Sequence, residues 1–179
     1  MNRIVLALAS GLALSTLHAQ DKPHAFVGAR ILPIEGPEIE SGVLVVQHGK
    51  IVAVGGPGTA IPADAVRHDA KGKVIMPGLV DSHSHIGSPE GADSAAPIQP
   101  EVRVSDSLNL RSATVMKARA GGITTVNVMP GSGHLLSGQT LYLKLRGGET
   151  VDALAIQKKA DGSYLGGMKM ANSTNPRRG

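Results

Sequence analysis

The sequence contains no cysteine, and this absence excludes several kinds of site. No disulfide, thiolate metal site or cysteine nucleophile can form, so any metal must bind through His, Asp or Glu. Aromatic residues are also scarce, with one Phe, two Tyr and no Trp among 179 residues. We therefore expect a core of Val, Ile, Leu and Ala. A nucleic-acid-binding role has little support, because few side chains could stack on bases.

The excess of positive charge is small, at +4 for the whole chain. Much of it lies near the C-terminus, at Lys158, Lys159, Lys169, Arg177 and Arg178. Basic residues in such a tail are usually solvated, so we predict that these side chains face water.

The first 19 residues have the pattern of a secretory signal. Arg3 supplies the positive region, residues 4–14 supply the apolar region, and residues 17–19 form a cleavage site before Gln20. The apolar run is shorter than the roughly 18 residues that a membrane span needs. We therefore predict no membrane span, and export to a bacterial periplasm or beyond, which also suits a chain without disulfides.

Residues 22–73 are typical of a small β module. The clearest signal is a hairpin, in which two β-branched runs at residues 43–47 and 50–54 are joined by His48 and Gly49. A two-residue turn that contains glycine is a strong hairpin pattern.

Residues 74–179 begin with a pattern that differs from the β module of residues 22–73. Residues 74–80 are almost continuously apolar, which predicts a strand buried on both faces of a parallel sheet. Residues 105–120 have a helical pattern with Ser105 or Asp106 as the cap, and residues 123–130 form a β-branched strand. Strand, helix and strand in this order predict a βαβ unit and an α/β fold.

Two histidines follow the apolar strand directly, at His83 and His85. Residues two apart on a strand point to the same side, so both imidazoles project together, with Asp81 beside them. The C-terminal ends of parallel strands are where α/β barrels and open α/β sheets place their active sites. Two imidazoles there can share one divalent cation, which we expect to be Zn²⁺.

The segment KVIMPGLVDSHSHIG resembles the first barrel strand of the metal-dependent amidohydrolase superfamily, whose signature there is Pro-Gly-[Leu/Phe]-[Ile/Val]-Asp-x-His-x-His. The upstream hairpin GVLVVQHGKIVAVG resembles the small β-sandwich that precedes that strand. The downstream segments AGGITTVNVMPGSGHLLSGQT and GGMKMANSTNPRRG are similar to the exported, imidazolonepropionase-like branch. The resemblance covers nearly the whole chain after the signal.

The resemblance implies a β-sandwich, from residues 22–73, beside a metal-dependent (β/α)₈ barrel that begins at residue 74. It implies hydrolysis of a carbon–nitrogen bond in a small molecule, such as a cyclic amide or a dipeptide. His83 and His85 would be two metal ligands, and Asp81 would support them. The substrate, the number of metal ions and the oligomeric state stay open.

The family's other ligands and its catalytic aspartate come from later barrel strands, so the catalytic residues are unknown here. A full barrel takes about 250 residues, and 50 follow Met129. We therefore expect an N-terminal piece of an amidohydrolase that has little or no activity alone. The one downstream histidine, His134, lies in the PGSGHLLSG loop and is a possible substrate-loop residue.

Three other functions compete with this one. Residues 133–140, GHLLSGQT, resemble a phosphate-binding loop, but Gln139 stands where the loop needs lysine. A serine hydrolase is disfavoured because no G-x-S-x-G elbow is present. The third possibility is a non-catalytic exported module that serves for binding or structure.

Overall fold

The computed structural model describes residues 22–88 and 95–177, which divide into two compact units at the Pro77–Gly78 bond. The described part of the first unit is residues 22–77, and that of the second is residues 78–88 and 95–177. The predicted secretory signal, residues 1–19, lies outside the described residues. Across the described ranges, no helix has both the length and the apolar character that crossing a membrane would require.

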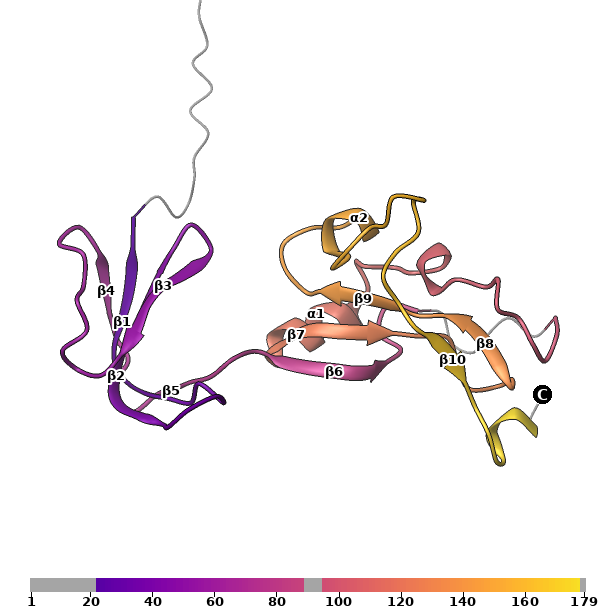
Figure 1. Cartoon of the computed structure of the whole chain (residues 1–179), viewed down its shortest axis with the longest axis horizontal. Helices are drawn as coiled ribbons and strands as arrows, with labels where there is room; N and C mark the ends of the chain where they lie inside the picture. The colour runs from indigo at the N-terminus through magenta and orange to yellow at the C-terminus, as the bar shows by residue number, and fades with distance from the viewer. Residues whose placement is uncertain (1–21, 89–94, 178–179) are drawn as a thin grey trace, which may run out of the picture. The chain divides into compact units, whose positions relative to one another are not determined.

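The first unit is a five-stranded mixed sheet with the strand order β3-β2-β1-β4, to which β5 adds by pairing with the C-terminal end of β1 (Figure 1). Neighbouring pairs β1–β2 and β2–β3 are antiparallel, whereas β4 and β5 run parallel to β1. The strands are β1 (His24–Ile31), β2 (Ile39–Gln47), β3 (Lys50–Gly55), β4 (Val66–Asp69) and β5 (Val74–Ile75).

The hairpin predicted from the sequence is confirmed in β2 and β3. Gln47 pairs with Lys50, so the turn consists of His48 and Gly49 alone. Both turn residues have positive φ, 50° and 71°, as a type I′ turn requires. The twist of that turn matches the twist of the two strands, which explains why so short a connection forms here.

A β-bulge divides the core of the first unit into two small clusters. The register of β1 against β2 shifts between Val27 and Ala29, and the intervening Gly28 has a φ of 86°. The extra residue reverses the alternation of side chains, so Ala29 does not join the cluster of Ala25. The buried members are Ala25, Val43 and Val45 in one cluster and Ala29, Ile31 and Ala70 in the other.

The second unit begins with the predicted βαβ arrangement, in which β6 (Leu79–Ser84) is parallel to β7 (Ile123–Val128) and α1 (Ala113–Ala120) lies between them in the chain (Figure 1). The fold class, a β module followed by the βαβ opening of an α/β domain, is confirmed. After β7, however, β9 pairs antiparallel with β7, and β8 pairs antiparallel with β10. The remaining elements are β8 (Leu136–Gln139), β9 (Leu141–Lys144), β10 (Met168–Met170), α2 (Val151–Leu154) and the 3₁₀ turns at Val104–Asp106 and Asn175–Arg177.

The prediction of one buried strand over residues 74–80 is wrong. Val74–Ile75 is a separate short strand of the first unit, and β6 starts only at Leu79. Pro77 lacks a backbone N–H, so it interrupts a strand that would otherwise continue. Val80 is 68% exposed and Leu79 is 51% exposed, so this part of β6 is not buried on both faces.

The predicted helix over residues 105–120 is correct only in its second half. The cap is Ser112, whose Oγ accepts a hydrogen bond from the backbone N–H of Val115, and not Ser105 or Asp106. Upstream, the side chain of Asn109 accepts a hydrogen bond from the backbone N–H of Arg111. Such a local turn satisfies the backbone outside a helix and competes with helix formation.

The core of the second unit lies where β7, β9 and both helices meet. Val126 and Val128 of β7 and Leu141 and Leu143 of β9 are almost fully buried. Each such side chain contributes roughly 1.5–3 kcal/mol on burial. The buried cluster is Val104, Leu110, Val115, Val126, Val128, Leu141, Leu143, Leu145, Leu154 and Ala155.

Candidate metal centre

His83 and His85 lie together at the C-terminal end of β6, as the sequence predicted. The residue between them, Ser84, is 3% exposed, and its carbonyl accepts a hydrogen bond from the N–H of Met129 at 2.9 Å. With Ser84 held against the end of β7, the two histidines project away from it. Their ring centres are 5.3 Å apart and the ring planes meet at 78°.

The hydrogen bond of His85 determines which of its nitrogens is free. Its Nδ1 lies 2.9 Å from the carbonyl oxygen of Met129. A carbonyl can only accept, so Nδ1 carries the hydrogen, and in the neutral tautomer with this bond Nε2 has the lone pair. Metal-binding histidines commonly have their second nitrogen fixed in this way.

Asp81 acts on the backbone rather than on a ring. Its Oδ1 accepts a hydrogen bond from the backbone N–H of His83 at 3.1 Å. This bond holds the chain in shape directly before the first histidine. The contact is compatible with the supporting position that we expected for Asp81.

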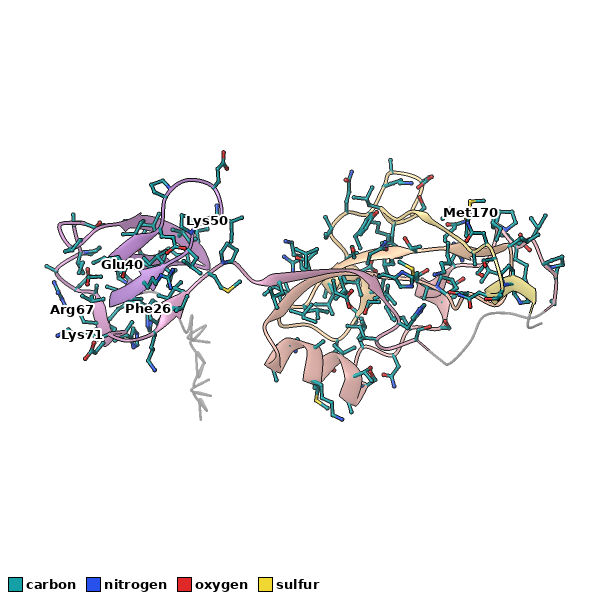
Figure 2. All side chains as sticks on the ribbon, turned by 90° about the horizontal axis from the view of Figure 1, so that it is seen from below. Phe26, Glu40, Lys50, Arg67, Lys71 and Met170 are labelled. Atoms are coloured by element: carbon teal, nitrogen blue, oxygen red, sulfur yellow. The ribbon has the colours of Figure 1, made fainter. Side chains whose placement is uncertain are left out.

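The structure adds a residue that the sequence did not reveal. Lys169 of β10 places its Nζ 3.2 Å from Nε2 of His83, 86 residues away in the chain. Lys169 is 6% exposed, so the prediction of a solvated tail is wrong for this residue, although it holds for Lys158 and Lys159. The clue in the sequence is the alternation in β10, where the lysine points inward and its neighbour Met170, labelled in Figure 2, is exposed.

Charge and burial favour the neutral form of His83. The Lys169 ammonium lowers the pKa of His83, and burial and the neighbouring His85 lower it further, against a smaller opposing effect of Asp81. Burial also lowers the pKa of the Lys169 amine. Only the neutral imidazole can ligate a metal ion, so the local electrostatics favour the form that a metal site needs.

The residues present fit part of a zinc site. Imidazole nitrogens are preferred zinc ligands, and a catalytic zinc usually has three protein ligands. Among residues 22–88 and 95–177, no group of three or more His, Asp or Glu side chains is close enough to hold a metal ion. His134 lies in a bend after β7, and in this described part of the chain it does not join His83 and His85.

The structure also disfavours a phosphate-binding loop at residues 133–140, in agreement with the sequence, where Gln139 replaces the required lysine. Residues 136–139 form β8, which pairs with β10, and do not form a loop that could surround a phosphate. The side chain of Gln139 donates a hydrogen bond to the carbonyl oxygen of Pro100 at 3.0 Å. The side-chain amide of Gln139 is therefore already hydrogen-bonded within the fold.

Comparison with known proteins gives consistent similarities. No protein-family profile matches the chain. It is 30% identical over 114 residues to the amidohydrolase tasK of Hapsidospora irregularis, which covers 58% of this chain and 12% of that protein. It is 47% identical over 51 residues to an imidazolonepropionase of Paracoccus denitrificans, which covers 27% of this chain and 12% of that protein.

The structural similarity extends over more of the chain. The crystal structure of an amidohydrolase from Thermotoga maritima matches with a TM-score of 0.73 and 31% identity, over 86% of this chain and 40% of that one. The chain thus spans about one-eighth of the length of the two relatives named above and two-fifths of the solved structure.

Proposed function

Since the chain corresponds to the N-terminal portion of an amidohydrolase-superfamily protein, we propose that it supplies the first metal-binding strand of a hydrolase that cleaves carbon–nitrogen bonds. The observation that carries the proposal is the pair of imidazoles at the end of β6, 5.3 Å apart. The substrate class that we propose is a small cyclic amide or a dipeptide-like amide, which agrees with the name of the Paracoccus relative.

His83 and His85 would hold the metal ion, for which we propose Zn²⁺. A bound zinc ion lowers the pKa of a water molecule to about 7 and so supplies hydroxide at neutral pH. The contribution of this chain is to present two imidazoles in a fixed position. The Met129 carbonyl orients His85, and Asp81 shapes the backbone at His83.

Lys169 must move when a metal ion binds Nε2 of His83, because the lysine nitrogen is already 3.2 Å from that atom. An ammonium group beside a divalent cation is repelled, and the repulsion is strong where water is partly excluded. Metal binding therefore requires Lys169 to withdraw or to lose its charge.

Two imidazoles are too few for an active zinc centre, which normally needs a third protein ligand and a general base. We therefore propose that the 179-residue chain binds metal but turns over amides slowly or not at all by itself. We also propose export, based on residues 1–19, which cell fractionation followed by peptide mapping of the mature N-terminus would test.

The experiment for the hydrolase function completes the site by grafting. The matching 40% of the Thermotoga maritima amidohydrolase is replaced by residues 22–179 of this chain, and the hybrid is assayed on an amide that the parent cleaves. We expect metal-dependent hydrolysis that is lost in the His85→Asn hybrid and kept in the His48→Asn hybrid. A folded hybrid that binds no metal, or whose activity ignores His85, would contradict the proposal and favour a non-catalytic module.

A further inference from the structure

Asn127 of β7 carries a buried polar atom that has no partner. Its Oδ1 is shielded from solvent and accepts no hydrogen bond from residues 22–88 and 95–177. Its neighbours in β7, Val126 and Val128, are fully buried in the core of the second unit. Because side chains alternate along a strand, Asn127 lies on the opposite face of the sheet. A buried amide oxygen without a donor costs free energy, so a group that donates to it in another state of the protein would stabilise that state.

The same face of the sheet carries the candidate metal centre. Ser84 pairs with Val128 in the parallel ladder of β6 and β7, so Ser84 lies on the core side and His83 lies on the side of Asn127. The register shifts just before Ser84, so that residues 82–83 stand opposite Asn127 alone. His83 and Asn127 are therefore neighbours on adjacent strands, which lie about 4.8 Å apart.

Lys169 reaches His83 from the far side of β7. In the three-stranded sheet β7 lies between β6 and β9 (Figure 1). The segment that leads into β10 bonds to β9, because the carbonyl groups of Leu165 and Gly167 accept hydrogen bonds from Tyr142 and Thr140. The Nζ atom of Lys169 is nevertheless 3.2 Å from Nε2 of His83. The lysine side chain therefore reaches across β7 on the histidine face.

Asn127 is the hydrogen-bond acceptor that β7 still offers on this face. By strand alternation the polar side chains of β7 on this side are Thr125 and Asn127. The hydroxyl of Thr125 already accepts a hydrogen bond from Nζ of Lys144 at 3.0 Å. Oδ1 of Asn127 is therefore the acceptor that remains for an ammonium group that crosses the strand.

We propose that Asn127 is a positioning residue of the metal centre and that its Oδ1 receives the ammonium of Lys169 when a metal ion takes Nε2 of His83. This inference rests on the proposed function, in which His83 and His85 bind the metal ion. The lysine stem is flexible, so its ammonium can change partner without movement of β10. The change satisfies the amide oxygen, frees the imidazole and takes the positive charge away from the cation. It thus lowers the free-energy cost of metal binding.

A double-mutant cycle on the Zn²⁺ affinity of the full chain, measured by calorimetry, tests this pairing. Lys169→Met should bind Zn²⁺ more tightly than the unmodified chain, because no ammonium has to move. Asn127→Leu is similar in shape but lacks the acceptor. It should weaken Zn²⁺ binding by about tenfold in the unmodified chain and by less than about twofold in the Lys169→Met chain. Asn172→Leu, at an exposed position after β10, is the control and should leave the affinity unchanged.

The outcomes separate this inference from the proposed function. Zn²⁺ binding in which Asn127→Leu has the same effect with and without Lys169, or no effect in either chain, would overturn this inference alone. Failure of all four chains of the cycle to bind Zn²⁺ would overturn the proposed function as well.

A second measurement needs no substitution. On saturation with Zn²⁺, the nuclear Overhauser contact between the ε-methylene of Lys169 and the ring of His83 should weaken. A contact with the side-chain amide of Asn127 should strengthen. An unchanged contact of Lys169 with His83 at saturating Zn²⁺ would overturn the proposal even if the Asn127→Leu chain does not fold.

Discussion

The two units of the chain bury their apolar residues differently. The first unit relies on a continuous ladder of strands, and its buried residues form two clusters of three, with alanine prominent in both. The second unit has fewer long strands but collects ten buried residues in one cluster. The comparison suggests that backbone pairing carries more of the stability in the first unit and side-chain packing carries more of it in the second.

The largest expected effect on stability comes from substitutions in the two cores. Leu143→Ala in β9 should lower the free energy of unfolding of the second unit by about 2–5 kcal/mol, through lost burial and a cavity. Ile31→Ala in β1 should fall at the lower end of the same range, because its cluster has three buried members and its larger neighbours are only partly buried. Hydrogen exchange measured by mass spectrometry separates the units. If Ile31→Ala lowered the free energy of unfolding as much as Leu143→Ala or more, the proposed difference between the two units would be wrong.

The next effect tests how closely the segment at Val102 approaches β8 in the second unit. Gly138 has a φ of 116°, and a Cβ atom there would lie 2.4 Å from the carbonyl oxygen of Val102. Gly138→Ala should therefore destabilise the unit by roughly 1–3 kcal/mol and displace β10, which carries Lys169. Gly133→Ala is the matched control, because nothing lies within 4 Å of its Cβ position. Urea unfolding measures the stability of both variants, and similar midpoints for Gly138→Ala and Gly133→Ala would contradict this expectation.

A smaller effect concerns pH. The pKa of His83 is lowered in the folded chain by Lys169 and by burial, whereas the unfolded value is about 6.5. Below about pH 6.5 the unfolded chain therefore binds more protons at this site than the folded chain does. The second unit should lose stability as the pH falls below about 6.5, and its stability should be fully present above that pH. Thermal unfolding between pH 7.5 and 5 measures the slope. His83→Asn should flatten it, and an unchanged slope would show that other groups are responsible.

The smallest effect is at the start of α1. Ser112→Ala removes the cap and should cost about 1 kcal/mol. Ser105→Ala, at the position where the sequence predicted the cap, should cost little because its hydroxyl contacts the exposed Asp106 side chain. Urea midpoints of the two variants that fall in the opposite order would contradict this assignment of the helix start.

The sequence predicted features whose causes are local. The β2–β3 hairpin follows from its two turn residues, and the parallel pairing of β6 and β7 follows from the order of strand and helix. The late start of α1 was missed because the Asn109 side chain offers an alternative local turn. The contact of Lys169 with His83 could not be predicted, since it depends on how β10 and β6 approach each other across 86 residues.

The contrast between local and long-range causes also applies to the two histidine pairs. His83 and His85 are separated by one residue, so strand alternation alone brings them together. His24 and His68, whose facing ring nitrogens are 2.9 Å apart, meet only because β4 runs parallel to β1 in one particular register. A register shifted by one residue would turn His68 to the other face of the sheet.

The central claim, that the end of β6 is a metal centre, is tested most directly by a Zn²⁺ titration of the chain followed on the imidazole resonances by nuclear magnetic resonance. This measurement identifies each histidine separately and so distinguishes the two pairs. The account predicts that the ring signals of His83 and His85 shift together and saturate with one Zn²⁺, while His134 stays unchanged. A folded chain in which neither His83 nor His85 responds to Zn²⁺ would contradict it.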